Sequence, residues 1–149
     1  MDRQQLIETV NRFFIAVDAR EWDKVEALMQ PQVQLDYTSM TGGQPATLHP
    51  EQIIASWKTI LPGFDATHHQ LGNHLVSQSD DAYLVFCYGT ASHFLKNDSG
   101  HNLWTVAGTY HISLKHVSGN YLIEAITFQL RFIDGNMELP VLAKKRIQG

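Results

Sequence analysis

The chain begins with apolar residues at helical spacing. Within residues 3–18 they recur every three or four positions, at Leu6, Val10, Phe13, Phe14 and Val17. This spacing predicts an amphipathic helix with one face on a core. A second apolar stripe within residues 21–29 ends before Pro31, and a third begins after His49-Pro50 and ends at Pro62-Gly63. Three helices are therefore expected in the first part of the chain.

Alternation of apolar and polar residues marks the strands. Val33, Leu35 and Tyr37 alternate with polar neighbours, which predicts a half-buried strand with Tyr37 on its apolar side. Four longer strands are expected at residues 69–77, 82–95, 104–117 and 121–133, separated by polar turns. Helices followed by such strands predict one α+β domain over residues 1–149, with a curved antiparallel sheet wrapped around the N-terminal helices.

Strand parity selects residues that face inward. His69 shares a face with Asn73, whereas His68 points to the opposite side. His93 shares a face with the small residues Gly89 and Ala91, which would leave space beside it. In the next strand, Gly108 and Tyr110 lie on the side expected to face the core. Together these positions predict a cavity with histidines in its wall.

The last strand is apolar on one side, at Ile126, Phe128, Leu130 and Phe132. Its other side carries Thr127 and Arg131, which we expect to point inward. An apolar outer sheet face favours association, so two copies are expected to pair back to back through it. Alternatively, the C-terminal tail at residues 137–147 covers the row within the same chain.

Bulk properties exclude several classes of function. The 149 residues are 44% apolar with a net charge of −4 and one cysteine, Cys87, whose apolar neighbours predict an inert buried thiol. Scattered cations and a pI near 6.0 argue against a nucleic-acid partner. No apolar stretch approaches the ~20 residues of a membrane helix, and the N-terminus has no signal-peptide pattern. A soluble, cytoplasmic protein is expected.

Metal and cofactor sites are not expected. The eight histidines lack ligand spacing, since His68, His69 and His74 cannot converge from one strand. Gly42-Gly43 lacks the strand, lysine and helix of a phosphate loop. One carboxylate remains of interest: Asp18 lies one turn after Phe14, near the core-facing side of the helix end. Its pattern fits a cap of the next helix and a functional site equally well.

Three segments, in this order, resemble the SnoaL-like superfamily and, within it, scytalone dehydratase: Val17-Asp18-Ala19-Arg20-Glu21-Trp22, Leu35-Asp36-Tyr37-Thr38-Ser39 and Thr67-His68-His69. The resemblance implies a cone of the nuclear transport factor 2-like, or cystatin-like, type with a closed cavity, often in a dimer. Asp18, Tyr37, His69 and His93 match the aspartate, a tyrosine and the two histidines of the dehydratase. The dehydratase has a tyrosine, a serine and an asparagine where this chain has Val17, Gly108 and Tyr110, which implies a differently shaped ligand.

The resulting hypothesis is a small-molecule enzyme without a cofactor: a dehydratase, isomerase or cyclase acting on a hydroxy-carbonyl or polyketide-like compound. His93 would exchange the proton with Asp18 orienting its ring, Tyr37 would bind the carbonyl oxygen, and His69 would hold water or return the proton. Substrate contacts are expected from Val17, Trp57, Asn73, Gly108, Tyr110, Thr127 and Arg131. Two alternatives stand beside it: a dimeric ligand-binding module without catalysis, and an epoxide hydrolase that uses Asp18 and Arg131.

Overall fold

The computed structural model describes residues 1–149, which form one six-stranded sheet and five α-helices. Across the sheet the strands follow the order β2 (Ala46–Leu48), β1 (Met29–Asp36), β6 (Asn120–Gly135), β5 (Leu103–Val117), β4 (Ala82–Phe94) and β3 (Ala66–Ser79). The helices are α1 (Arg3–Ala19), α2 (Trp22–Ala27), α3 (Thr38–Thr41), α4 (Pro50–Trp57) and α5 (Leu139–Gln148), with a short 3-10 turn η1 (Leu61–Gly63) after α4. The predicted α+β class is confirmed.

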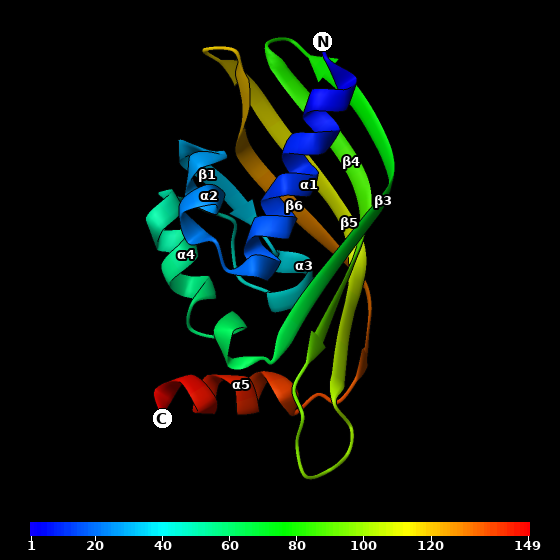
Figure 1. The fold of residues 1–149 in the computed structure, drawn as a ribbon. Helices are drawn as coiled ribbons and strands as arrows, with labels where there is room; N and C mark the ends of the chain where they lie inside the picture. The colour runs from blue at the N-terminus through cyan, green and yellow to red at the C-terminus, as the bar shows by residue number, and fades with distance from the viewer.

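The sheet curves around the N-terminal helices. Figure 1 shows α1 lying along the concave face of β3 to β6, with α2 and α4 beside it and α5 across one end of the sheet. Neighbouring strands are antiparallel except β1 and β6, which run parallel. Alternation along a strand does not encode its direction, so the sequence could not reveal this parallel pair.

Helix α1 is anchored at both ends. The Asp2 carboxylate accepts a hydrogen bond from the backbone N–H of Gln5 (3.0 Å) and so caps the first turn. At the other end Arg20 takes a left-handed conformation (φ 57°), and its guanidinium donates to the carbonyl oxygens of Leu61 and Phe64. The end of α1 is thereby tied to η1 and the segment that follows it.

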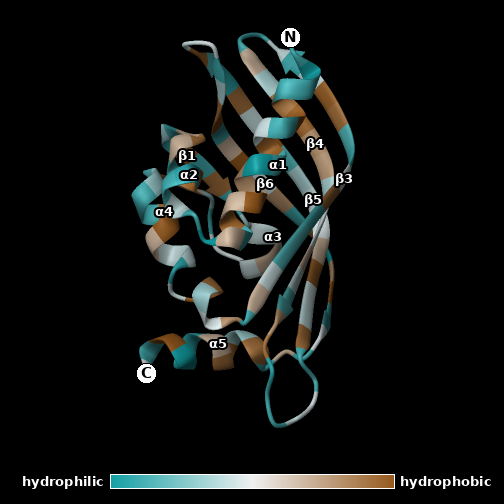
Figure 2. Ribbon diagram, in the orientation of Figure 1, coloured by the Kyte–Doolittle hydropathy of each residue, from teal (hydrophilic) through white to brown (hydrophobic).

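The apolar stripe of α1 forms the middle of the core. Leu6, Val10 and Phe13 are fully buried against the inner side of the sheet. Figure 2 shows hydrophobic residues on the facing parts of α1, α4 and the strands, whereas the loop between β4 and β5 is almost entirely hydrophilic. The helical pattern in the sequence therefore identified the core-facing side of α1 correctly.

An irregularity in β3 overturns one predicted inward position. Up to Gly72 the strand pairs in simple register with β4, but the register shifts before Leu75. Asn73 occupies this bulge with φ 56° and is exposed. A bulge adds one residue to a strand and reverses the faces beyond it, so Asn73 does not share the side of His69.

The predicted faces of β6 were also wrong. Tyr110 and Ile112 of β5 lie directly opposite Phe128 and Ile126, and paired residues share a face of the sheet. Ile126 and Phe128 are therefore buried inside, while Thr127 lies on the outer face.

Arg131 sits at a register shift between Leu130 and Phe132 and is exposed. Arg131 has the parity of Thr127, so its predicted inward position was wrong because the two faces of β6 were assigned the wrong way round. A second bulge lies at Arg131 itself. Beyond it, Phe132 turns outward and is 58% exposed.

The C-terminal tail does not cover the apolar row of β6. It forms α5, which packs on η1 through buried Leu139 and Ala143. Arg146 fastens the helix by donating to the Asp65 carboxylate and the carbonyl oxygen of Gly63.

The outer sheet face still carries exposed apolar side chains, among them Leu84 and Tyr88 on β4. Back-to-back pairing of two copies through this face stays a prediction.

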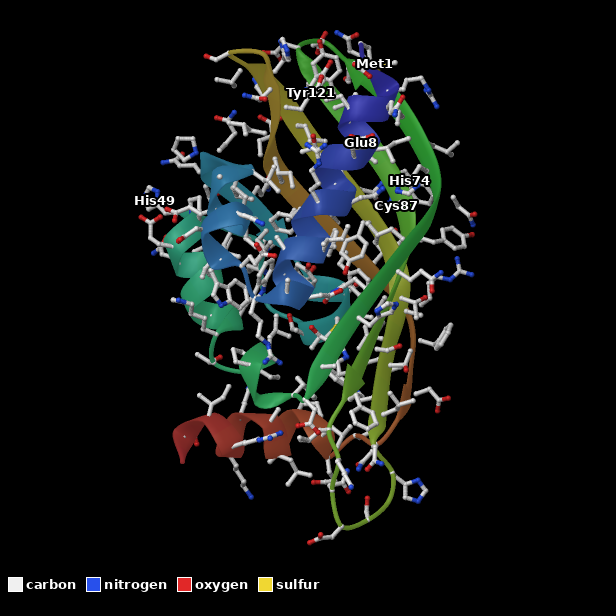
Figure 3. All side chains as sticks on the ribbon, viewed as in Figure 1. Met1, Glu8, His49, His74, Cys87 and Tyr121 are labelled. Atoms are coloured by element: carbon white, nitrogen blue, oxygen red, sulfur yellow. The ribbon has the colours of Figure 1, made fainter.

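Cys87 lies on the inner side of β4, close to α1 (Figure 3). Burial raises the pKa of its thiol to about 12, so the thiol stays protonated and unreactive near neutral pH. None of the helices is both long and apolar enough to span a membrane.

The contact between η1 and α5 gives a stability prediction. A Cβ added to Gly63 would lie 2.1 Å from the backbone oxygen of Ala143, and a helix backbone cannot yield as a side chain can. Gly63→Ala should therefore lower the free energy of unfolding by about 1–3 kcal/mol, measured by urea denaturation.

Gly72→Ala is the matched control, because nothing lies within 4 Å of its added Cβ. Its effect should stay within about 0.5 kcal/mol. Equal losses in the two variants would contradict the close approach of α5.

Candidate active site

A cavity of about 340 Å³ lies between the concave sheet, the end of α1, α3 and the segment from α4 to η1. Thirteen of its seventeen lining residues are hydrophobic. The lining residues are Phe14, Val17, Leu35, Tyr37, Met40, Thr41, Ser56, Trp57, Ile60, Leu61, His69, Ala91, His93, Trp104, Val106, Tyr110 and Phe128. No lysine, arginine or carboxylate is among them. The cavity suits a small, largely apolar ligand with a few polar atoms.

Asp18 and His69 form a hydrogen-bonded pair at the wall of this cavity. The Nδ1 atom of His69 lies 2.7 Å from Oδ1 of Asp18. The same carboxylate accepts the backbone N–H of His69 at 2.7 Å and the hydroxyl of Thr67 at 3.0 Å. The last turn of α1 is thus joined to the start of β3, and three donors hold the carboxylate in place.

The pair fixes the chemical state of both partners. Burial alone would raise the pKa of Asp18, but the bonds and charge interaction with His69, together with Thr67, outweigh it and leave the pKa below its usual value. An ionised carboxylate only accepts hydrogen bonds, so Nδ1 of His69 carries the proton. Its Nε2 atom has no protein partner, and His69 lines the cavity. This nitrogen can therefore take a proton from a ligand.

His93 lies deeper and is only 5% exposed. Its Nδ1 donates to the carbonyl oxygen of Trp104 at 3.0 Å, and its ring packs on those of Phe64 and Trp104. Burial lowers the pKa of His93 to about 4, against the opposing effect of the Trp104 carbonyl. His93 is therefore neutral near pH 7 and presents Nε2 as a hydrogen-bond acceptor.

Two phenols complete the polar groups of the cavity. Tyr37 follows β1, and Tyr110 comes from the middle of β5. Both of their rings pack on the ring of Phe128. Burial raises the pKa of Tyr37 and that of Tyr110, so both stay protonated and can donate to a ligand oxygen.

The predicted site residues separate into two groups. Val17, Tyr37, Trp57, His69, His93 and Tyr110 line the cavity, with Asp18 directly behind His69. Asn73, Thr127 and Arg131 do not line it, for the reasons of register given above. Because Arg131 is exposed, it does not join Asp18 in the arrangement expected of an epoxide hydrolase.

Gly108 was expected to contact the ligand, but protein atoms occupy the space beside it. A Cβ there would lie 2.3 Å from the carbonyl oxygen of Gln129 and 2.5 Å from the Phe128 ring. The missing side chain of Gly108 makes room for Phe128, which lines the cavity in its place.

The partner of Asp18 also differs from the prediction. We expected Asp18 to orient His93, or to cap the following helix. Instead its carboxylate binds His69, and the cap position of α2, Glu21, has no side-chain hydrogen bond. Asp18 is therefore not a helix cap.

Several residues of the site were not predicted from the sequence. Thr67 binds Asp18, and its parity with His69 could have indicated this. Trp104 supports His93 and shares parity with Val106, so the same rule applied to β5 would have found it. Phe14 and Phe128 were assigned to a helical stripe and to the outer row, which gave no hint of a cavity.

No group of three or more His, Cys, Asp or Glu side chains is arranged to hold a metal ion. His49 and His74, for example, lie on opposite sides of α1 (Figure 3). A larger, open depression lies between the β4–β5 loop and α5, but its one imidazole, His101, has no acidic partner. The inner cavity is therefore the candidate active site.

The α+β fold is similar to those of solved structures that are described as NTF2-like and as cystatin-like. The model of the SnoaL-like domain matches residues 1–127. The chain belongs to the SnoaL-like domain family. A search of curated proteins finds no match.

Several solved structures share the fold. A protein of Kribbella flavida is 22% identical, with a TM-score of 0.85 over 96% of this chain and 97% of its own. A provisionally named scytalone dehydratase of Novosphingobium aromaticivorans is 14% identical, with a TM-score of 0.74 over 89% and 86%. A provisionally named dehydratase of Streptomyces avermitilis, from the NTF2-like family, is 13% identical with a TM-score of 0.73 over 88% and 97%.

The environment of His93 predicts a pH-dependent stability. Its pKa is about 4 in the folded protein and about 6.5 in an unfolded chain. Between these values the unfolded chain takes up a proton that the folded protein does not. Through His93 alone, acidification from pH 6.5 to 4 should therefore lower the free energy of unfolding by about 3 kcal/mol. Urea unfolding at several pH values measures this loss.

His93→Gln should flatten this dependence. Part of the slope should remain, because burial also lowers the pKa of His74. A slope identical to that of the wild type would show that His93 is not held in its neutral form.

Proposed function

We propose that the protein is a cofactor-independent lyase that removes water from a hydroxy-carbonyl compound, with His69 and Asp18 moving the proton. One observation carries this proposal: the 2.7 Å hydrogen bond to Asp18 leaves Nε2 of His69 free at the wall of an apolar cavity. A carboxylate behind an imidazole fixes its tautomer and stabilises the imidazolium that forms when a proton arrives.

The reaction begins at the carbon next to the carbonyl group. His69 Nε2 takes a proton from this carbon, and the electrons of the broken C–H bond move to the carbonyl oxygen as an enolate. The Tyr37 hydroxyl donates a hydrogen bond to that oxygen as its charge grows. The enolate then re-forms the carbonyl, and the electrons of its C=C bond form a new double bond between the deprotonated carbon and the next carbon, whose C–O bond breaks. The departing hydroxyl takes the proton from His69 and leaves as water.

His93 serves a different purpose from the one expected from the sequence. With a pKa of about 4 it is a weak base near neutral pH. Its unprotonated Nε2 accepts a hydrogen bond from the hydroxyl of the substrate and so turns the oxygen of that hydroxyl toward His69. The two histidines therefore divide the work into proton transfer and orientation.

The names of similar solved structures support a reaction that eliminates water. Two of those described above are provisionally named dehydratases. Isomerisation or cyclisation would share the first step, because each also begins by removing a proton beside a carbonyl. The proposal therefore rests on the proton transfer, and the later steps depend on the substrate.

Proton removal can be tested without the natural substrate. Bicyclic ketones and β-hydroxy ketones are incubated with the protein in D₂O. Mass spectrometry measures deuterium gained beside the carbonyl, and enone absorbance measures water lost. Asp18→Asn and His69→Gln should each lower the rate on the order of 10²- to 10⁴-fold, because each removes one partner of the proton-transfer pair.

Matched controls are available on the surface. His68→Gln alters the neighbouring histidine, which is exposed on the opposite side of β3, and Asp81→Asn alters an exposed carboxylate paired with Lys115. Both should keep the wild-type rate. If the wild type binds these ketones but neither exchanges deuterium nor releases water, the protein is a ligand-binding module and the lyase proposal is wrong.

A further inference from the structure

One oxygen of the Asp18 carboxylate receives two hydrogen bonds from β3. Its Oδ1 atom lies 2.7 Å from Nδ1 of His69 and 3.0 Å from the hydroxyl oxygen of Thr67, while Oδ2 accepts the backbone N–H of His69 at 2.7 Å. An ionised carboxylate can only accept hydrogen bonds, so the Thr67 hydroxyl donates its proton. The hydroxyl of Thr67 and the ring of His69 therefore share the oxygen on which the proposed proton transfer depends.

The Thr67 hydroxyl is shielded from solvent. The residue is only 7% exposed and stands opposite His93 in the pairing of β3 with β4. The ring of His93 is bonded to the carbonyl oxygen of Trp104 rather than to Thr67. Asp18 is thus the one side chain to which Thr67 is hydrogen-bonded, and a valine of nearly the same shape would remove this bond without opening a cavity.

Asp18 has no permanent cation beside it. Its one ion-pair partner is His69, which is charged only while it holds a second proton. At other times neutral donors stabilise the carboxylate, and the bond from Thr67 is one of those that lower its pKa. Removing this donor would make the carboxylate a stronger base, because hydrogen bonds to the charged form of an acid favour that form.

A more basic Asp18 would compete for the proton on Nδ1 of His69. Across the 2.7 Å hydrogen bond, this proton can stay on the imidazolium or cross to Oδ1. The imidazolium is an acid that can return its Nε2 proton to a departing hydroxyl group, whereas a neutral ring with its only proton on Nε2 is far too weak an acid. Donation from Thr67 to Oδ1 favours the imidazolium, and so it favours the step in which water leaves.

We propose that Thr67 is a positioning residue, which holds Oδ1 of Asp18 against His69 and keeps the shared proton on the imidazole ring. This inference rests on the proposed function and assigns the group that makes the His69 cation a competent acid. Thr67 acts on the substrate only through Asp18 and His69. A purely structural role, in which the hydroxyl only ties α1 to β3, would affect the stability of the fold but not the position of this proton.

The position of the proton can be observed directly by NMR. Histidine labelled with ¹⁵N identifies a proton on a ring nitrogen, and its absence in His69→Gln assigns the signal to His69. A proton that is shared more equally between nitrogen and oxygen resonates at lower field. The Nδ1 proton should therefore move to lower field in Thr67→Val, and it should return toward the wild-type position in Thr67→Ser, which restores the hydroxyl.

The reaction provides a second readout. With a β-hydroxy ketone in D₂O, the water released per deuterium gained should fall about tenfold in Thr67→Val, because proton removal persists while return of the proton to the hydroxyl slows. Thr9→Val is the matched control: Thr9 is 6% exposed, and its hydroxyl donates to the carbonyl oxygen of Gln5 at 2.8 Å, within α1. This variant should leave both the resonance and the ratio unchanged.

Two results would overturn the inference: a Nδ1 resonance in Thr67→Val that is unchanged or lies at higher field, or a Thr67→Ser variant that behaves like Thr67→Val. The first would mean that Thr67 does not weaken the hold of Oδ1 on the proton, and the second that its hydroxyl is not the group that matters. The NMR measurement needs no turnover. A shift as expected, together with full deuterium exchange in Asp18→Asn, would uphold the role of Thr67 at Oδ1 while rejecting the proposed proton transfer.

Discussion

The attachment of Asp18 to β3 is the contact on which both the fold and the candidate site depend. A carboxylate near the interior of a protein is costly unless donors surround it. Here a backbone N–H, a hydroxyl and an imidazole supply those donors, all from the first residues of β3. The same bonds place the end of α1 against the sheet and set the direction of the His69 ring. Structure and chemistry therefore share one set of contacts.

The apolar cavity has a uniform effect on the titratable groups that face it. Burial lowers the pKa of His93 and raises those of Tyr37 and Tyr110, so each of the three favours its neutral form. Only Asp18, with its pKa held below the usual range, keeps a charge there. A proton that reaches His69 thus meets a single negative charge, directly behind the ring that receives it.

How far the sequence could predict this arrangement depended on the regularity of each strand. The alternation of faces along a strand correctly predicted that Tyr37, His69, His93 and Tyr110 point inward. The strands β3, β4 and β5 are regular around His69, His93 and Tyr110. The alternation failed at Asn73, where one extra residue changes the face without disturbing the apolar pattern. For Thr127 and Arg131 the apolar row of β6 was assigned to the wrong face of the sheet, and only the pairing of β6 with β5 shows the correct face.

Contacts between distant segments were beyond the reach of the sequence. The family resemblance supplied one aspartate and two histidines, but not which histidine the aspartate binds. The segment that forms α5 was expected to be a tail, because its packing on η1 requires a close approach of Gly63 to the backbone of Ala143 that no local pattern reveals. The cavity-lining roles of Phe14 and Phe128 likewise follow only from the curvature of the sheet.

Gly89 and Gly108 affect the shape of the cavity but not its reactive groups. They face each other across β4 and β5, and each leaves room for one aromatic ring, Tyr110 or Phe128. Neither glycine carries a group that could react. A methyl group at either position would displace a ring and change which ligands fit, while Asp18 and His69 kept their bond. In this scaffold, the shape of the cavity can change without any change in the Asp18–His69 pair.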